Sequence, residues 1–369
     1  MDAGKEKIGY PVLELDLKKL RHNVDQVVQI CEKQGIGVAG VIKGFTGIPQ
    51  GAKEFKDAGC QYIASSRLEQ IEGAMTYGIG GPFMLIRTPM LSEAEDVVRL
   101  ADISLNSEIG VLKQLNREAA RQGKLHNVLL MIELGDLREG FWSKEELLDA
   151  ALLVEKELDH LFLAGVGVNL GCYGSIMATC EKMEELIADA EMIETAIGRR
   201  LDIISGGATS SLPLVMNGTM PSRINNLRIG EGIILARDLQ VLYQVDMSFM
   251  HRDAFLLKAE VIEAKNKPSY PIGVLAFDAF GKTGTYTDRG MRRKALLALG
   301  KADFAYMDMI YPKEKGVEIL GASSDHLILD IEEAERNIDV GDILEFDLSY
   351  ASLVFASSSP SVRIQCKSC

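Results

Sequence analysis

The sequence predicts an α/β fold in which a (β/α)8 TIM barrel is followed by a mostly β C-terminal domain. Between about residues 38 and 231, eight short, almost wholly apolar segments alternate with helix-like stretches, as expected for strands that are buried on both faces. Eight strand–helix units in roughly 200 residues match such a barrel. An open doubly wound sheet is the alternative, but it usually opens with a G-x-G-x-x-G turn. The nearest match, Gly165-Val-Gly-Val-Asn-Leu170, lacks the third glycine.

The pattern of apolar and polar residues predicts the individual strands and helices. The predicted barrel strands span residues 38–43, 62–65, 83–87, 103–106, 128–133, 163–169, 202–205 and 226–230. Residues 143–155 are typical of the intervening helices, because a serine and then carboxylates open an amphipathic run.

After about residue 240 the helical pattern gives way to alternating strands, which we predict at residues 255–262, 294–299, 327–330 and 343–348. The length of 369 residues fits about two domains. We therefore assign residues 1–240 to the barrel domain and residues 241–369 to the β domain. For the strand at 12–17, membership of the β domain stays open as an alternative.

Composition restricts the function classes. Asp and Glu number 53 against 40 Lys and Arg, for a formal charge of −13, which disfavours binding to nucleic acid or anionic membranes. No apolar run approaches the ~18 residues of a membrane span, and the first residues lack the apolar region of a signal peptide. The six cysteines show no zinc-binding pattern, and Cys366 and Cys369 lie in the chain's tail. We expect a soluble, cytoplasmic protein without a metal site.

Polar residues close the predicted barrel strands, where barrel enzymes carry their catalytic groups. Lys43 closes the first strand, and partial desolvation there would make its amine nucleophilic; a lysine that extends past the rim to water is the alternative. Ser205-Gly-Gly-Ala-Thr-Ser210 follows the seventh strand and suits a phosphate, although such a segment alone is often only a turn. A lysine nucleophile beside a phosphate site indicates a sugar-phosphate aldolase or a pyridoxal phosphate enzyme.

Several motifs together resemble one family. They are Tyr10-Pro-Val-Leu-Glu-Leu-Asp-Leu-Lys-Lys-Leu-Arg-His-Asn23, Val41-Ile-Lys43, Leu134-Gly-Asp-Leu-Arg-Glu-Gly-Phe141, Gly165-Val-Gly-Val-Asn-Leu-Gly-Cys-Tyr-Gly174, Asn226-Leu-Arg-Ile-Gly-Glu231 and Leu320-Gly-Ala-Ser-Ser-Asp-His-Leu327. The chain is similar over nearly its whole length to the fold-type III pyridoxal phosphate enzymes, the alanine racemase family, and most of all to their ornithine racemase branch.

The resemblance implies residue roles. Lys43 would bind pyridoxal 5'-phosphate covalently and serve as one of two acid–base groups, Arg228 would face the pyridine nitrogen, and Arg138 would lie near the cofactor's phenolic side and the substrate. The implied phosphate-binding residues are Ser205, Gly207, Thr209, Gly230, Glu231 (through its backbone) and Tyr350. The family forms homodimers with shared active sites, in which Ser324 and Asp325 of the other subunit would close over the substrate carboxylate.

Two positions depart from the family pattern. Asn169 replaces the histidine that stacks on the pyridine ring, and Phe280, in the segment Ala279-Phe-Gly281, replaces the tyrosine that acts as second base. Because phenylalanine carries no proton, Asp278, Tyr286 and Tyr270 are the nearest candidates for that role. If Asp278 instead binds a cationic side chain, the second base is elsewhere.

We predict a racemase that acts on a basic amino acid, ornithine first and lysine second, by two-base transfer of the α-proton. Candidate partners for the substrate's side-chain ammonium are Asp136, Glu139, Glu108 and Asp278. A non-catalytic pyridoxal phosphate carrier, a lyase and a decarboxylase on the same fold are the alternatives. We expect the isolated histidines His22, His126 and His160 to lie at the surface.

Overall fold

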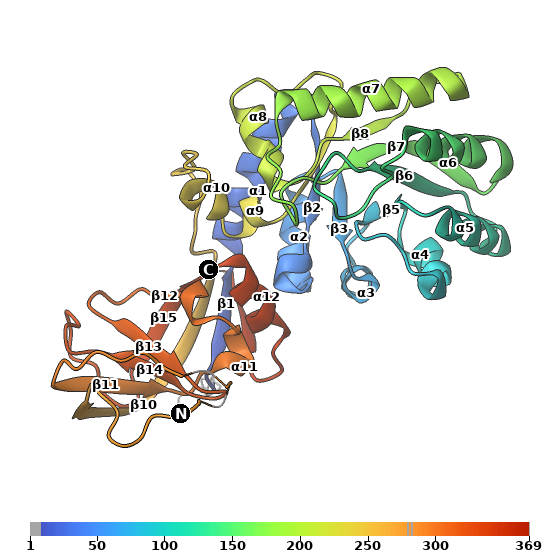
Figure 1. Ribbon diagram of the computed structural model, residues 1–369. Coiled ribbons are helices and arrows are strands. Elements are labelled where there is room, and N and C mark those ends of the chain that lie inside the picture. The colour runs from blue at the N-terminus through green and yellow to red at the C-terminus, as the bar shows by residue number, and fades with distance from the viewer. Residues whose placement is uncertain (1–8, 279, 282, 369) are drawn as a thin grey trace. The chain divides into compact units, whose positions relative to one another are not determined.

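The computed structural model describes residues 9–278, 280–281 and 283–368. The chain divides into two compact units: residues 19–251, and residues up to 18 together with those from 252 onward. We call them the barrel unit and the β unit and describe each by itself (Figure 1). Among the described residues, no helix is long and apolar enough to cross a bilayer.

The barrel unit is a closed barrel of eight parallel strands in chain order, which confirms the predicted fold class. Its strands are β2 (Gly37–Val41), β3 (Tyr62–Ser65), β4 (Phe83–Leu85), β5 (Ile103–Asn106), β6 (His126–Ile132), β7 (Leu161–Val168), β8 (Ile203–Ser205) and β9 (Asn226–Ile229). The pairing of β9 with β2, from Gly37 opposite Asn226 to Gly40 opposite Ile229, closes the barrel. The closure brings the segments after β7, β8 and β9 to the same rim as Lys43, which follows β2.

Helices surround this barrel on the outside (Figure 1). They are α1 (Leu17–Glu32), α2 (Pro49–Asp57), α3 (Leu68–Thr76), α4 (Ala94–Leu100), α5 (Ile109–Gln122), α6 (Lys144–Glu157), α7 (Cys180–Ile197), α8 (Leu212–Met216), α9 (Glu231–Ile234) and α10 (Asp238–Val241). Helix α6 begins as the sequence predicts, since the Ser143 hydroxyl accepts a hydrogen bond from the Glu146 N–H at 3.3 Å and caps the first turn.

Alternate strand residues build one apolar core cluster. Ile103 and Leu105 of β5 and Leu129 and Met131 of β6 belong to it, as expected for side chains that alternate between the two faces of a strand. His126 at the start of β6 is 2% exposed, so its expected surface position is wrong. Its Nε2 lies 2.8 Å from the Ser104 hydroxyl, and burial lowers its pKa to about 4. The sequence did not indicate that β6 begins as early as this residue.

The β unit is a mostly antiparallel eight-stranded sheet with two short helices. Its elements are β1 (Val12–Asp16), β10 (Phe255–Pro268), β11 (Met291–Leu297), α11 (Lys301–Phe304), β12 (Ile310–Pro312), β13 (Glu318–Ala322), β14 (Leu327–Asp330), β15 (Ile343–Leu348), α12 (Tyr350–Ser358) and β16 (Arg363–Lys367). Strand β1, whose assignment the sequence left open, pairs with β10 and with β16.

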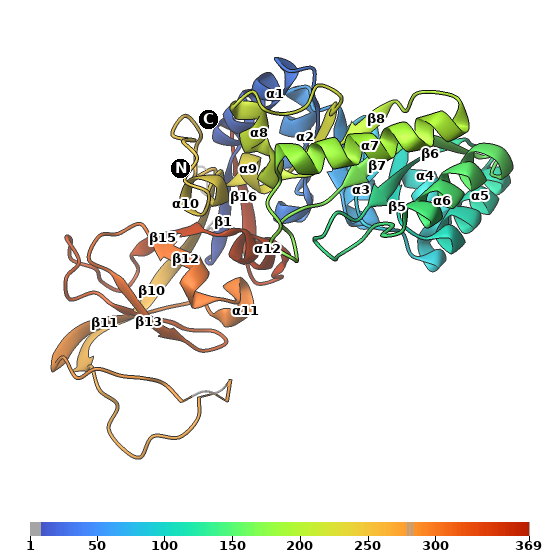
Figure 2. The same cartoon turned by 45° about the horizontal axis from the view of Figure 1, so that its top comes forward.

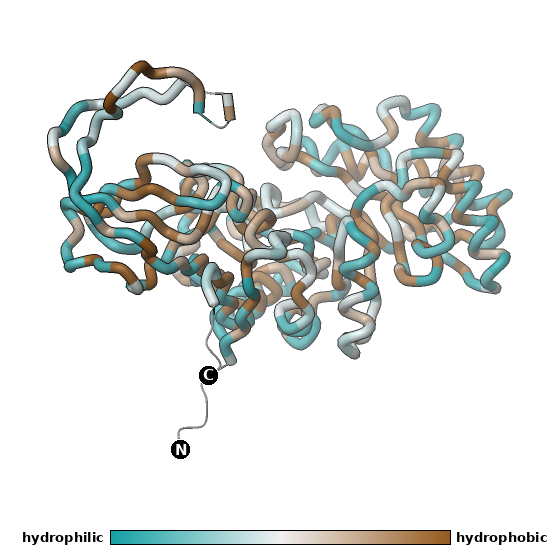
Figure 3. The backbone as a smooth tube through the Cα atoms, turned by 90° about the horizontal axis from the view of Figure 1, so that it is seen from below, coloured by the Kyte–Doolittle hydropathy of each residue, from teal (hydrophilic) through white to brown (hydrophobic). Residues whose placement is uncertain are grey.

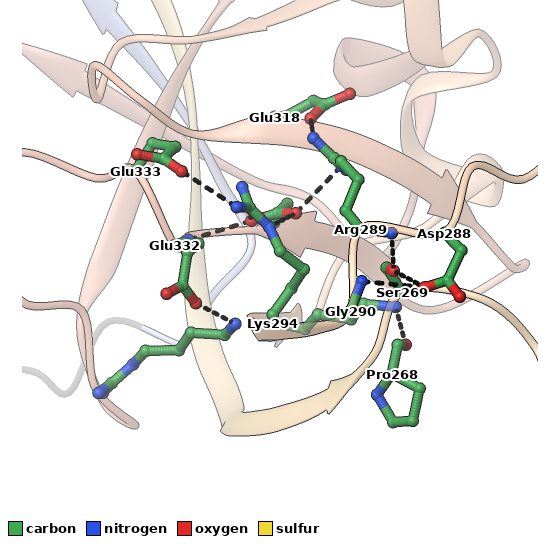
Figure 4. Close-up of polar contacts among 12 residues, drawn as sticks. Pro268, Ser269, Asp288, Arg289, Gly290, Lys294, Glu318, Glu332 and Glu333 are labelled. Carbon is green, nitrogen blue, oxygen red and sulfur yellow. Dashed lines mark hydrogen bonds and ion pairs between the residues drawn. The ribbon is translucent and has the colours of Figure 1, made fainter.

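A long loop, residues 269–290, connects β10 to β11 and extends from the sheet (Figure 2). Hydrogen bonds and ion pairs hold its two ends (Figure 4). The Ser269 N–H donates to the Gly290 carbonyl at 2.9 Å, and Arg289 bonds Glu318 at 2.9 Å and Asp330 at 3.1 Å. The stem of the loop is therefore fixed to β13 and β14.

Residues 272–277 of this loop are largely apolar (Figure 3), and several of their side chains are exposed. Ile272 is 91% exposed, Val274 101% and Phe277 77%. Contiguous exposed apolar residues of this kind usually mark an interaction surface.

Candidate active site

Lys43 lies at the barrel rim, two residues beyond the end of β2 at Val41. It opens a single 3-10 turn, Lys43–Phe45, and its side chain is partly buried. Burial lowers the pKa of the Lys43 amine, and the guanidinium groups of Arg138 and Arg228 lower it further, while Cys172 and Glu139 act in the opposite direction. Since a lowered pKa enlarges the neutral, nucleophilic fraction of an amine, the site favours covalent chemistry at Lys43.

Arg228, near the end of β9, is buried and is held at two points. Its Nη1 donates to the Ser205 hydroxyl at 2.6 Å, and its Nη2 donates to the Val168 carbonyl at 2.7 Å. The Ser205 hydroxyl in turn donates to the Asn226 side-chain oxygen at 2.7 Å. Burial lowers the pKa of Arg228 to about 10, so its guanidinium is still protonated at neutral pH. No described carboxylate forms an ion pair with it, and the buried cation suits a polar ligand atom.

The segments after β8 and β9 form a tight backbone cradle. Gly207 has φ +107°, and a Cβ there would lie 2.6 Å from the Ser211 hydroxyl, so only glycine fits. The Thr209 hydroxyl accepts the Gly232 N–H at 3.1 Å and joins the two segments. A Cβ on Gly230 would lie only 3.2 Å from the Val41 Cβ.

Glu231 is a buried residue, and its carboxylate is hydrogen-bonded to the backbone of the segment that follows. Its Oε1 accepts the backbone N–H groups of Arg237 and Asp238 at 2.9 and 3.0 Å. Its Oε2 is buried without a hydrogen-bond partner among the described residues. The Glu231 side chain is therefore anchored to the start of α10 through one of its two oxygens.

Asn169, at the end of β7, has one satisfied and one unsatisfied side-chain atom. The residue is 7% exposed, and its Oδ1 accepts a hydrogen bond from the Cys172 thiol at 3.4 Å. Its Nδ2 is buried and has no partner among the described residues. An unsatisfied buried donor costs about 1–3 kcal/mol, and an acceptor on a bound ligand would remove that cost.

Asp136 organises the rim between β6 and β7. Its fully buried carboxylate accepts four backbone N–H groups, those of Gly171, Cys172, Tyr173 and Ile176, at 2.9–3.3 Å. Burial alone would raise the pKa of Asp136, but these four donors outweigh it and lower the pKa. A carboxylate engaged in this way is not available to a substrate ammonium, which was one of the roles considered from the sequence.

The Glu133 carboxylate holds the backbone around Arg138 in a similar way. Its carboxylate accepts the backbone N–H groups of Gly135, Leu137 and Arg138 at 2.6, 2.9 and 3.0 Å. The Arg138 side chain pairs with Glu139, with 2.6 Å between Nη2 and Oε1. Sequence reasoning recognised Glu133 only as a polar strand end, because its backbone contacts depend on how the following loop folds back.

The predicted site residues fall into two groups, one in each unit. The barrel unit holds Lys43, Arg138, Asn169, Ser205, Gly207, Thr209, Arg228, Gly230 and Glu231, and electrostatic interactions link Lys43 directly to both arginines. The other predicted residues, Asp278, Tyr286, Ser324, Asp325 and Tyr350, belong to the β unit.

Within the β unit, Asp278 and Tyr286 have local partners. The Asp278 Oδ1 accepts the Phe280 N–H at 2.9 Å, and the Tyr286 ring packs edge-on against Tyr270 with centroids 6.2 Å apart. The Ser324 hydroxyl donates to the Asp325 carboxylate at 2.7 Å. Ala279, part of the segment compared with the family's second base, lies outside the described residues.

Curated relatives match nearly the whole chain. An ornithine racemase of Acetoanaerobium sticklandii is 39% identical over 345 residues, which cover 94% of this chain and 96% of the relative. A lysine racemase of Thermotoga maritima is 39% identical over 357 residues, which cover 96% of this chain and 98% of the relative.

Solved structures support the fold. Alanine racemase from Streptomyces lavendulae superposes with a TM-score of 0.75 at 14% identity and covers 99% of this chain and 98% of its own. A D-threonine aldolase from Filomicrobium marinum gives 0.73 at 16% identity, covering 95% of this chain and 89% of its own. Residues 15–238 match the family model described as alanine racemase, N-terminal domain. Together with the two curated relatives, this match shows that the chain belongs to the alanine racemase family.

Proposed function

We propose that this chain is a pyridoxal 5'-phosphate-dependent racemase of a basic amino acid, with ornithine as first and lysine as second substrate. The observation that carries the proposal is the joint placement of Lys43, Arg228 and the unsatisfied Asn169 amide at one barrel rim. The names of the two relatives that are 39% identical support both the reaction and the substrate class.

The residues present fit the cofactor. A partly buried amine with a lowered pKa suits the aldehyde, the buried Arg228 cation suits the pyridine nitrogen, and the Asn169 Nδ2 lacks an acceptor. The remaining residues that would hold pyridoxal phosphate are Arg138, Ser205, Gly207, Thr209, Gly230, Glu231 and Tyr350. When bound, the cofactor supplies an electron-withdrawing ring that acidifies the α-carbon hydrogen of an attached amino acid.

The chain's own residues hold and move the protons. Lys43, whose pKa is lowered, accepts or returns the proton at the α-carbon. Arg228 keeps its proton at neutral pH, so it would donate a hydrogen bond to the pyridine nitrogen and leave that nitrogen unprotonated. Such a contact would limit charge withdrawal by the ring and would favour simple return of a proton over side reactions. Ser205 and the Val168 carbonyl fix the Arg228 guanidinium in place, and we propose positioning of Arg228 as the role of the Ser205 side chain.

A basic substrate needs a carboxylate for its side-chain ammonium, because an unpaired buried charge is costly. Since the Asp136 carboxylate is occupied by backbone donors, Glu139, Glu108 and Asp278 remain as candidates. Glu139 already pairs with Arg138, so a substrate ammonium there would share an existing ion pair.

We also propose that the protein is a homodimer with shared active sites. The exposed apolar residues of the loop 269–290 support a partner surface, and the second subunit would contribute Ser324 and Asp325 to the substrate carboxylate. Sedimentation at several protein concentrations tests this, with an Ile272→Asp and Val274→Asp double variant expected to shift the equilibrium towards monomer. A monomeric wild-type protein with full activity would contradict the shared site.

The activity itself is tested by chiral chromatography. Protein loaded with pyridoxal phosphate is incubated separately with L-ornithine, L-lysine and L-alanine, with Lys43→Ala as control. We expect D-ornithine to form fastest and D-lysine next, and no product with the control. Release of carbon dioxide would instead indicate a decarboxylase, and release of an aldehyde would indicate a lyase. No conversion of any substrate would favour the non-catalytic carrier.

A further inference from the structure

Lys301 lies where two separate parts of the β unit meet. It is the first residue of α11, and its Nζ is 3.8 Å from the centroid of the Phe280 ring. Phe280, which cannot carry a proton, belongs to the segment that we compared with the family's second base. The structure therefore places an amine directly against a side chain that we expected at the position of that base.

The backbone around Lys301 is built into the turn that carries Ser324 and Asp325. The N–H groups of Lys301 and Ala302 donate to the carbonyls of Ser323 and Ser324 at 2.9 and 3.1 Å. A Cβ on Gly300 would lie 1.9 Å from the Ser324 carbonyl oxygen, so the turn closes this tightly only with glycine there. Lys301 is thus held against the residues that we propose to contact the substrate carboxylate.

Further contacts fix α11. Asp303 is 7% exposed, and its carboxylate accepts the Gly300 N–H and the Ser359 hydroxyl, each at 3.0 Å. The Ser352 hydroxyl of α12 donates to the Phe304 carbonyl at 3.0 Å, which ties α11 to the helix that begins with Tyr350. So rigid a support is what a proton-transfer group requires.

The charges near Lys301 leave its amine without a fixed counter-ion. No described carboxylate lies within ion-pair distance of its Nζ. The Asp303 carboxylate accepts the Gly300 N–H, and the Asp325 carboxylate accepts the Ser324 hydroxyl. The Asp278 carboxylate accepts the Phe280 N–H. The aromatic face of Phe280 attracts the ammonium form without the geometric demand of a salt bridge.

We propose that Lys301, contributed by the second subunit, is the second acid–base group of the racemase site, in place of Asp278 or Tyr286. This inference rests on the proposed function and on its shared site. In one direction the neutral Lys43 amine takes the α-proton and becomes an ammonium, while the Lys301 ammonium gives a proton to the same carbon and becomes neutral. The electron pair of the broken C–H bond ends in the new C–H bond, and the total charge is unchanged. The opposite enantiomer reacts by the reverse transfers.

The test separates proton exchange from inversion. Wild type, Lys301→Met and Lys301→Ala are loaded with pyridoxal phosphate and incubated in D2O with L- and D-ornithine, followed by NMR and chiral chromatography. Lys301→Met keeps the apolar stem and removes only the amine. We expect racemisation to fall by about 100-fold or more, while Lys43 still exchanges the α-proton of one enantiomer with retention. Methylamine or ethylamine should partly restore racemisation by Lys301→Ala.

Controls make each outcome decisive. Lys315→Gln, at a lysine that is 78% exposed and pairs loosely with Glu335, should behave as wild type, and the visible absorption of the bound cofactor should persist in both Lys301 variants. Unchanged racemisation in Lys301→Met, or no amine rescue together with lost cofactor absorption, would overturn the proposal. So would selective loss of inversion in Tyr286→Phe or Asp278→Asn. If wild type itself neither exchanges nor inverts any substrate, the proposed function fails instead.

Discussion

Asp136→Asn tests the claim that one buried carboxylate builds the rim of the site. The Asp136 Oδ1 accepts the N–H groups of Gly171 and Ile176, and the Oδ2 accepts those of Cys172 and Tyr173. Asparagine keeps one oxygen and places an NH2 group against the other two donors. Hydrogen bonds to charged groups contribute about 1.5–3 kcal/mol each, so the loss of two of these bonds should cost about 3–6 kcal/mol.

Thermal unfolding followed by circular dichroism measures the effect. For a unit of this size, a cost of about 3–6 kcal/mol lowers Tm by roughly 6–24 °C. The exposed Asp159→Asn is the matched control and should change the free energy of unfolding by less than about 0.5 kcal/mol. If Asp136→Asn shifts Tm no more than this control does, the carboxylate does not organise the rim and our reasoning is wrong.

The same variant has a pH signature. Because the pKa of Asp136 is lowered in the folded protein, its stabilising contribution is present above the ordinary Asp pKa of about 3.9 and is lost as pH falls through the lowered value. The difference in unfolding free energy between wild type and Asp136→Asn should therefore be largest near neutrality and shrink in acid. A difference that grows as pH falls below about 4 would contradict the assignment.

Three further predictions concern individual site residues. Lys43→Ala should lose the visible absorption of bound pyridoxal phosphate, and an unchanged band would exclude Lys43 as the attachment point. Iodoacetamide should alkylate Cys172, which is exposed, and mass spectrometry follows the labelling. Pyridoxal phosphate should protect Cys172 but not Cys180. Equal labelling of Cys172 with and without the cofactor would place it outside the site. Burial raises the pKa of Glu231 from 4.5 to about 7, so wild type should lose about 3 kcal/mol of unfolding free energy as pH rises from 4.5 to 7. In denaturant titrations, Glu231→Gln should lose less unfolding free energy than wild type over this pH range. The same pH dependence in variant and wild type would refute the assignment of this loss to Glu231.

Much of the barrel was predictable because strand burial leaves a one-dimensional signal. Strands β3 and β5 have the predicted bounds, since apolar residues flanked by turn residues define them. The same pattern placed Lys43 at the end of the first strand, although β2 ends two residues earlier, at Val41. The family was recognisable because its motifs are spread over both units.

The supporting contacts were not predictable, because they join residues far apart in sequence. Nothing near Asp136 indicates that its carboxylate binds the backbone of residues 171–176. Likewise, the contact between Lys301 and Phe280 depends on the return path of the loop 269–290. His126 was misplaced for a related reason, since its burial is set by its pairing partners and by Ser104.

Deuterium incorporation at the α-carbon tests the central claim most directly. Protein loaded with pyridoxal phosphate is incubated in D2O with L-ornithine, and the α-proton signal and the enantiomer ratio are followed in the same sample. We predict loss of the α-proton signal together with accumulation of α-deuterated D-ornithine, and neither change with Lys43→Ala. An intact α-proton signal with ornithine, lysine and alanine alike would contradict the assignment of this site to amino-acid racemisation.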